Sequence, residues 1–393
     1  MSVVTEPVAK AKSVRLVSLD AFRGATIIGM ILVNNPGSWA NVYAPLLHAE
    51  WHGWTPTDLV FPFFLYIVGI AIPLAFGKYL ARGDSRGMLL RKTVKRSAIL
   101  FGLGVFMAAF PFITFEPDFG LRPGLERLRI MGVLQRIALC YLAAAVLFLY
   151  AKPRTEWIIA AALLLGYWAA MMLIPVPGYG AGQIDIPEAN LAAYLDRLVL
   201  TEAHLWAGAD RMWDPEGLFS TLPAIVTTLI GVWAGRLFSA DLPPVDRTAK
   251  LFVYGFAMLT AGYLWAWAFP LNKALWTSSY VLFTAGIAQC VLAVCYWFAD
   301  VQGRQRWTIP LQVYGVNAIT VFFFSGLVGK ALYLIRIAQP DGSSPTIKGL
   351  LYDAVFVPLG PPKVASLLFA LTWITAWFGV LWAMWKRGLV VKV

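Results

Sequence analysis

Ten long apolar runs, recurring from about residue 18 to residue 385, constrain this chain more than any other feature. Each run approaches the roughly 20 residues that an α-helix needs to cross a lipid bilayer. Only 13% of the 393 residues are charged, against roughly 25% in soluble domains. We therefore predict an all-α, polytopic membrane protein, with residues 1–393 forming one integral-membrane domain, a single helical bundle in the lipid bilayer. The predicted spans are 18–36, 57–77, 93–111, 130–150, 156–174, 218–237, 250–269, 277–299, 309–327 and 364–385.

The positions of lysine and arginine predict how the bundle is oriented. With the N-terminus in the cytoplasm, 20 of these 32 residues fall in cytoplasmic segments and 10 in outer segments, while Arg23 and Arg136 lie inside spans. Cytoplasmic loops carry an excess of Lys and Arg, so both termini are predicted to be cytoplasmic. The net charge of +11 then reflects topology, and we expect no nucleic-acid partner. The first span has a cleaved signal peptide as its alternative, but no convincing small-residue cleavage site follows it.

All three histidines, His48, His52 and His204, fall on the outer side in this orientation. So do the two longest loops, about 175–217 and 328–363, and connections of that length are usually functional or disordered. The three cysteines lie inside apolar runs, where we expect them to pack. Because no metal-ligand motif occurs, no metal is predicted.

The loop from His48 to Asp58 places two histidines directly before an apolar run. A histidine near a carboxylate is what acid–base chemistry at neutral pH requires. Thr55-Pro56-Thr57-Asp58 has the pattern of a helix start, with Thr55 as the N-cap and an acid in the first turn. Asp58 therefore has a capping role, and it could also orient the imidazole of His48. An ordinary surface histidine is the alternative for His48.

Polar residues mark both ends of the first span. Asp20 and Arg23 share a helix face, so they either pair with each other or leave Arg23 to bind an anionic ligand from the cytoplasm. Asn34 and Asn35 close the span directly before Pro36, where a helix end needs polar caps. An amide that donates to a developing oxyanion is the alternative, and spacing alone favours the cap.

Two more polar segments lie at the outer ends of predicted spans, and one predicted span contains a cation, Arg136. Asp214-Pro215-Glu216-Gly217 has the N-cap, proline and acid of a helix start, and its carboxylates could bind the hydroxyls or amine of a polar substrate. Asn272, Lys273 and Trp276 lie in a short outer turn that puts a cation beside an indole. Arg136 lies inside the fourth span, where a functional role with a carboxylate or phosphate partner is the default expectation.

Taken together and in this order, these segments resemble the transmembrane acyltransferase family that includes heparan-α-glucosaminide N-acetyltransferase and its bacterial NagX-like relatives. Each motif is weak alone, but their succession along most of the chain is specific. The matching segments are Arg15–Gly24, Val33–Gly37, His48–Phe64, Gly132–Arg136, Asp214–Gly217, Asn272–Trp276 and Gly315–Ala318.

The resemblance implies that an acetyl group passes from cytoplasmic acetyl-CoA, a co-substrate, to the amine of an amino sugar on the far side of the membrane. It implies that His48 is the catalytic histidine, with Asn34 and Asp58 as its catalytic partners. The residues predicted to contact the acceptor are Asp214, Glu216, Asn272, Lys273 and Trp276. The residues predicted to contact acetyl-CoA are Arg23, Arg136 and Asn317.

In this interpretation His48 either takes the proton of the amine or first accepts the acetyl group as an acyl-imidazole, and the sequence leaves both open. Asn34 would donate to the oxyanion, and the basic segment from Lys78 to Arg96 would attract the CoA phosphates. The animal enzyme's large luminal N-terminal domain has no counterpart here, which favours a small acceptor such as glucosamine. The alternative function is a transporter of an amino sugar such as N-acetylglucosamine. We expect the protein to lie in the bacterial inner (cytoplasmic) membrane. The sequence does not decide whether it forms a homodimer.

Overall fold

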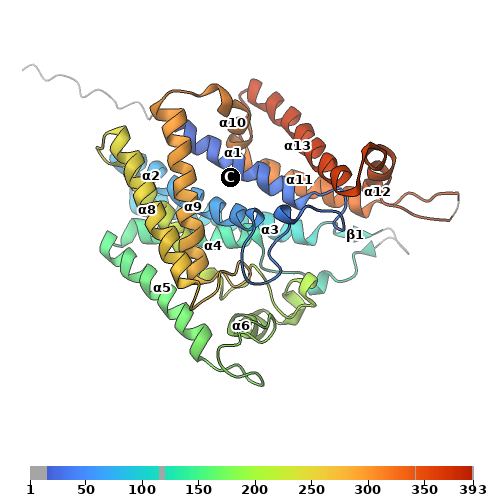
Figure 1. Cartoon of the computed structure of the whole chain (residues 1–393), viewed down its shortest axis with the longest axis horizontal. Coiled ribbons are helices and arrows are strands. Elements are labelled where there is room, and N and C mark those ends of the chain that lie inside the picture. Colours follow the sequence, from blue (N-terminus) through green and yellow to red (C-terminus); the bar gives the residue numbers. More distant parts are fainter. Residues whose placement is uncertain (1–15, 115–119, 341, 392–393) are drawn as a thin grey trace, which may run out of the picture.

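The computed structural model describes residues 16–114, 120–340 and 342–391, and this part of the chain is a bundle of helices (Figure 1). Its one sheet within these ranges is a two-stranded hairpin of β1 (Ile113–Thr114) and β2 (Gly120–Leu121). The predicted all-α fold is confirmed. In chain order, the α-helices are α1 (Val17–Asn34), α2 (Val60–Ala81), α3 (Arg86–Ala109), α4 (Val133–Tyr150), α5 (Pro153–Leu173), α6 (Leu191–Leu200), α7 (Thr221–Ser239), α8 (Pro244–Trp265), α9 (Ser278–Tyr296), α10 (Ile309–Val316), α11 (Ala318–Leu334), α12 (Ile347–Leu351) and α13 (Pro362–Lys386).

Each predicted apolar run coincides with one of these helices or with a pair of them. Within the described residues, seven helical segments are long and apolar enough to cross a membrane, and the bent pair α10–α11 makes an eighth if it is one span. α3 and α8 have 24 and 22 residues, but both begin with charged turns that lower their hydropathy. The chain is therefore a multi-pass membrane protein.

The predicted span 309–327 is not one straight helix. α10 and α11 are bent by 66° at Asn317, whose backbone (φ −114°, ψ 34°) leaves the helical region. The Oδ1 atom of Asn317 accepts the backbone N–H of Val391 (3.0 Å), and its Nδ2 donates to the carbonyl of Leu389 (3.2 Å). The predicted span is therefore a bent pair of helices, and this amide ties Leu389 and Val391 to the break. Asparagine side chains often compete with helical hydrogen bonds in this way.

α1 lies within the bundle and packs against α2, α9, α10 and α13 (Figure 1). Its close crossing with α10 depends on Gly24 and Gly315, because a Cβ at either position would overlap the backbone of the other helix. Gly69 of α2 and Gly231 of α7 allow a second close crossing for the same reason. Small residues are common at such crossings in membranes, where they let backbones approach.

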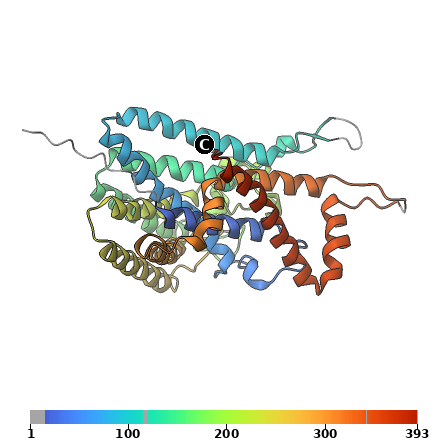
Figure 2. The same ribbon diagram turned by 90° about the horizontal axis from the view of Figure 1, so that it is seen from above.

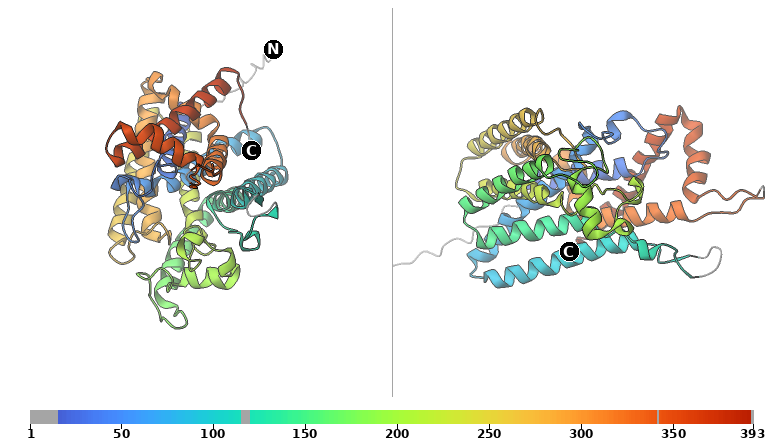
Figure 3. Two further views of the ribbon diagram at one scale, coloured as in Figure 1. Left: turned by 90° about the vertical axis from the view of Figure 1, so that its right-hand side faces the viewer. Right: turned by 90° about the horizontal axis from the view of Figure 1, so that it is seen from below.

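Long helices cross the middle of the molecule, and different helices lie at its two ends. Seen from above, α3 and α4 run side by side along one edge (Figure 2), and they pack against each other. α5 and α8 lie toward one end of the molecule, and α12 and α13 toward the opposite end (Figure 3). Between them, polar contacts join the segments that precede α2, α4, α7 and α9. That junction is the first place to look for a site.

Candidate active site

His48 and Asp58 are in direct contact. Nδ1 of His48 lies 2.6 Å from Oδ1 of Asp58, which is buried, whereas the side chain of His48 is 48% exposed. A carboxylate can only accept, so this contact places the proton of the neutral imidazole on Nδ1. Nε2 then carries a lone pair. This is the tautomer and orientation that a general base or nucleophile needs.

The local fold explains why Asp58 is held so firmly. Asp58 lies in the short helical turn η2 (Pro56–Leu59), and its Oδ2 accepts the backbone N–H of Thr55 (2.9 Å), as the acid of a capping box does. Oδ2 also accepts the N–H of Ala49 (3.0 Å), which fixes the residue next to His48. The predicted helix start is confirmed. Capping and orienting the imidazole are both done by one carboxylate.

Lys273 lies against the imidazole of His48. Its amine is 3.1 Å from Nε2 and 3.3 Å from Nδ1, although the two residues are 225 positions apart. Its turn is rigid: Oδ1 of Asn272 accepts the N–H of Leu275 (2.8 Å), and the buried indole of Trp276 donates to Oγ1 of Thr227 (3.1 Å). Burial lowers the pKa of Lys273, against the opposing charges of nearby carboxylates.

A second set of charges continues from Lys273. Nε of Arg129 donates to Asp214 (2.8 Å), and its Nη2 lies 2.5 Å from oxygens of both Asp214 and Glu216. Burial raises the pKa of Asp214. Burial acts the same way on Glu216, but the charges of Arg129, Lys273 and Arg136 outweigh it and lower the pKa of this carboxyl. We call His48, Asp58, Lys273, Glu216, Arg129 and Asp214 the His48 cluster.

Asp214 does not cap α7 as its sequence pattern suggested. α7 begins at Thr221, and Asp214 instead bonds Arg129 and the backbone N–H of Glu216 (2.9 Å). The intervening turn is held from outside, because Oδ1 of Asp196 in α6 accepts the N–H groups of residues 218 (2.9 Å) and 219 (3.1 Å). The helix therefore starts later than the pattern predicts.

Arg136, near the start of α4, is completely buried beside this cluster. Its Nη2 donates to the carbonyl of Gly217 (2.9 Å) and to Oγ of Ser220, and its guanidinium carbon lies 5.2 Å from the centre of the Trp276 ring. Nε and Nη1 have no hydrogen-bond partner among the residues that the structure describes. Its direct partners are thus a carbonyl, a hydroxyl and an aromatic face, with Glu216 interacting at longer range.

The other two residues predicted to contact acetyl-CoA lie at the crossing of α1 and α10. Nη1 of Arg23 is 3.4 Å from Oδ1 of Asp20 and from the carbonyl of Gly315, so the predicted Asp20–Arg23 pair forms. Asn317, two residues beyond Gly315, holds the end of the chain. The structure therefore brings Arg23 and Asn317 into one region and places Arg136 in another.

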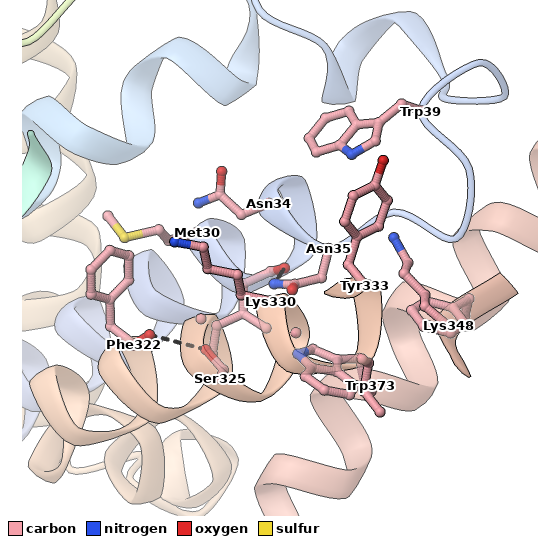
Figure 4. Close-up of a pocket in the computed structure, with 15 residues that line it drawn as sticks. Met30, Asn34, Asn35, Trp39, Phe322, Ser325, Lys330, Tyr333, Lys348 and Trp373 are labelled. Carbon is pink, nitrogen blue, oxygen red and sulfur yellow. Dashed lines mark hydrogen bonds between the residues drawn. The ribbon is translucent and has the colours of Figure 1, made fainter. Parts of the chain in front are cut away.

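Asn34 is the third residue predicted to be catalytic. It lies in the last turn of α1 and lines a cavity of about 210 Å³ between α1, α11 and α13 (Figure 4). Among the hydrogen bonds of the described residues, none joins Asn34 to His48 or Asp58. Its neighbour Asn35 donates to the carbonyl of Ile31 (2.8 Å), which is the predicted helix cap.

Three residues of these sites went unnoticed in the sequence. Arg129 was counted only as a loop cation, although it stands just before the segment that contains Arg136. Lys330 was likewise counted as a loop cation, although α11 carries it inside an apolar helix. Asp196 has no motif at all, because its role depends on the backbone of a turn more than 20 residues away. Lys273 was predicted as a substrate contact, but its proximity to His48 has no sequence signal.

The sequence of this chain is similar to those of known proteins over most of its length. Residues 15–259 match the family model described as heparan-alpha-glucosaminide N-acetyltransferase, catalytic. The heparan-alpha-glucosaminide N-acetyltransferase of Homo sapiens is 33% identical over 364 residues, which cover 78% of this chain and 52% of that protein. The protein of the same name from Mus musculus is 31% identical over 362 residues, covering 78% and 53%. The chain thus spans about half the length of the curated relatives it matches.

Proposed function

Because the chain belongs to the heparan-alpha-glucosaminide N-acetyltransferase catalytic family, we propose that it is a membrane enzyme that moves an acetyl group from acetyl-CoA to the amine of a glucosamine-like amino sugar. The observation that carries this proposal is the imidazole of His48, which buried Asp58 holds at Nδ1 so that the lone pair of the neutral ring is on Nε2. The amine attacks the thioester carbonyl, the new C–N bond forms, and the C–S bond breaks to release CoA.

His48 handles the proton in this reaction. Nε2 takes it from the attacking amine and returns it to the departing thiolate, so CoA leaves as a thiol. The charge of Asp58 stabilises the imidazolium that forms in between. In the alternative order, Nε2 itself attacks the thioester and the amine then displaces the imidazole from the acyl-histidine. Both routes use the same nitrogen in the same orientation.

Lys273 indicates where the acceptor amine binds. Its amine lies against the imidazole, 3.1 Å from Nε2 and 3.3 Å from Nδ1, and the carboxylates of Glu216 and Asp58 attract it there. An amino sugar would displace one ammonium group with another at the same place. Asp214 and Glu216 would then face the sugar, while the buried Asn272 and Trp276 would hold the turn that carries Lys273.

The acetyl donor, acetyl-CoA, would contact the residues that the sequence predicted for it. Arg23, Asn317 and the basic segment from Lys78 to Arg96 would meet CoA at the cytoplasmic face of a bacterial inner membrane. Two nitrogens of Arg136, Nε and Nη1, are left to donate to an anionic part of a substrate. Asn34 would donate to the oxyanion if the thioester carbonyl lies between its cavity and His48.

The proposal is tested with purified protein in detergent and acetyl-CoA that carries a radiolabelled acetyl group. We expect label in glucosamine with the wild type and none above background with His48→Ala. His204→Ala is the matched control, because His204 is also an outer histidine but bonds the carbonyl of Leu128 (2.7 Å). Full transfer by His48→Ala would refute the mechanism, and no transfer to any amino sugar by the wild type would refute the function.

An amino-sugar transporter is the second candidate, and the bend between α10 and α11 is the observation that favours it. Interrupted helices line the substrate sites of many transporters. Uptake of N-acetylglucosamine into proteoliposomes without any acyl donor would support it. Uptake that is absent, together with acetyl transfer in detergent, would reject it.

A further inference from the structure

The cavity at the end of α1 has walls unlike those of the His48 cluster. α11 contributes Ser325, Gly326 and Gly329 to its wall, and of the two glycines Gly329 faces Asn35 and Trp373 whereas Gly326 faces Met107 of α3. A Cβ at Gly329 would lie 3.0 Å from Oδ1 of Asn35, so any larger residue there would narrow the space. A volume of about 210 Å³ is below the roughly 300–1,000 Å³ of pockets for drug-sized ligands. The cavity therefore suits one ring and excludes a whole coenzyme.

Two lysines give this cavity a positive charge. The amine of Lys330 donates to the carbonyls of Met107 (3.1 Å) and Ala108 (3.4 Å), and that of Lys348 donates to the carbonyl of Pro36 (2.7 Å). None of the described residues along the wall is acidic. Carbonyls orient the two amines without neutralising them, and an ammonium has three N–H donors. Burial lowers the pKa of Lys348, a cost that a bound anion would relieve. We call this space the lysine cavity.

Aromatic rings and amides complete the wall. Trp39 and Tyr333 lie at one side with 59% and 63% of their surface exposed, and Trp373 lies on the opposite side (Figure 4). The indole N–H of Trp373 has no hydrogen-bond partner among the described residues. Asn34 adds an amide that can both donate and accept. Aromatic faces pack on the C–H faces of sugar rings, and amides bond hydroxyls.

We propose that the lysine cavity binds a monosaccharide unit that carries an anionic group. The anion lies between Lys330 and Lys348, and the ring packs against Trp39 and Tyr333. A carboxylate, a sulfate and a phosphate share this chemistry, and the experiment separates them. The inference does not depend on acetyl transfer, because its readout is binding to a site other than His48.

The test is isothermal titration calorimetry on the purified full chain with glucuronate, glucose 6-sulfate and glucose 6-phosphate as probes. Neutral glucose controls for the charge, and glycerol 3-phosphate, which has an anion but no ring, controls for a lipid headgroup. We expect saturable binding of at least one acidic sugar and at least about tenfold weaker binding of both controls, since a hydrogen bond to a charged group is worth about that factor. Equal binding of glucose, equal binding of glycerol 3-phosphate, or no binding of any acidic sugar would overturn the proposal.

Variants locate the site. Lys330→Gln and Lys348→Gln should each weaken binding of the acidic sugar about tenfold or more. Lys363→Gln is the matched control, because Lys363 is an exposed lysine near the same end of α13 but not on the cavity wall. Lys330→Arg keeps the charge and should retain most of the affinity, which separates loss of charge from misfolding. Unchanged affinity in the Lys330→Gln, Lys348→Gln double variant would contradict the assignment.

Discussion

The His48 cluster and the lysine cavity differ in whether their cations are paired with carboxylates. In the His48 cluster each cation faces a carboxylate: Arg129 meets Asp214 and Glu216, and Lys273 lies near Glu216 and Asp58. In the lysine cavity the amines donate to backbone carbonyls, Lys348 also lies 5.4 Å from the centre of the Phe369 ring, and none of the described wall residues is a carboxylate. An internally paired network is rigid and can orient reacting groups, whereas unneutralised cations gain most when a ligand supplies the missing charge.

We infer from this difference that the His48 cluster carries out the reaction and that the lysine cavity binds a ligand. If it holds, substitutions in the His48 cluster change the turnover number or the stability, and substitutions in the lysine cavity change affinity. Each prediction below tests one side of that contrast.

The largest expected effect belongs to His48→Ala. Because Nε2 moves the proton or carries the acetyl group, the turnover number should fall by about 10³-fold. Initial rates of acetyl transfer at saturating acetyl-CoA measure it, with thermal unfolding as the check on folding. A variant that retains near wild-type turnover would remove His48 from the chemistry.

Asp58→Asn should cost about 10²-fold in turnover, since the amide no longer stabilises the imidazolium. Thr55→Ala is the control for the capping role: it removes a hydroxyl that bonds the carbonyl of Leu47 (2.6 Å) and Oδ2 of Asp58 (3.2 Å), but it leaves Oδ1, the oxygen that contacts His48. We expect Thr55→Ala to lower the melting temperature with turnover nearly unchanged. Equal loss of turnover in both variants would mean that Asp58 acts only by holding the loop.

Arg129→Gln tests whether pairing stabilises the His48 cluster. It leaves Asp214 and Glu216 buried without their cation, and breaking a buried pair typically costs about 3–5 kcal/mol of unfolding free energy. Lys330→Gln breaks no ion pair and should cost less than about 1.5 kcal/mol. Chemical denaturation in detergent compares the two. A similar loss in both variants would erase the contrast between the regions.

The smallest expected effect is the pH dependence caused by Asp196. Burial raises the pKa of this carboxyl from 3.8 to about 6, so the folded state holds the proton more tightly than the unfolded state. Its contribution to stability is therefore present at pH 4 and is lost as the pH rises past 6. Asp196→Asn should be more stable than the wild type by about 3 kcal/mol at pH 8, a difference that falls to nearly zero as the pH drops below 4. A constant difference across this range would contradict the assignment.

Local sequence patterns predicted where most helices lie, but not the contacts between residues that are distant in sequence. Apolar length placed the helices, and the Thr55–Asp58 pattern placed the start of α2 because its contacts span only a few residues. The break at Asn317 and the late start of α7 escaped prediction because partners distant in sequence, Leu389 and Asp196, decide them. For the same reason Lys273 could be noticed as a polar residue but not placed at His48.

The central claim is that His48 transfers acetyl groups to an amine on the face of the membrane opposite acetyl-CoA. The most direct test uses vesicles in which the protein has one orientation, with acetyl-CoA on the face that carries Lys78–Arg96 and glucosamine on the other. We expect N-acetylglucosamine on the glucosamine side with the wild type and none with His48→Ala. Product formed only when both substrates share one face, or formed equally by His48→Ala, would contradict the account.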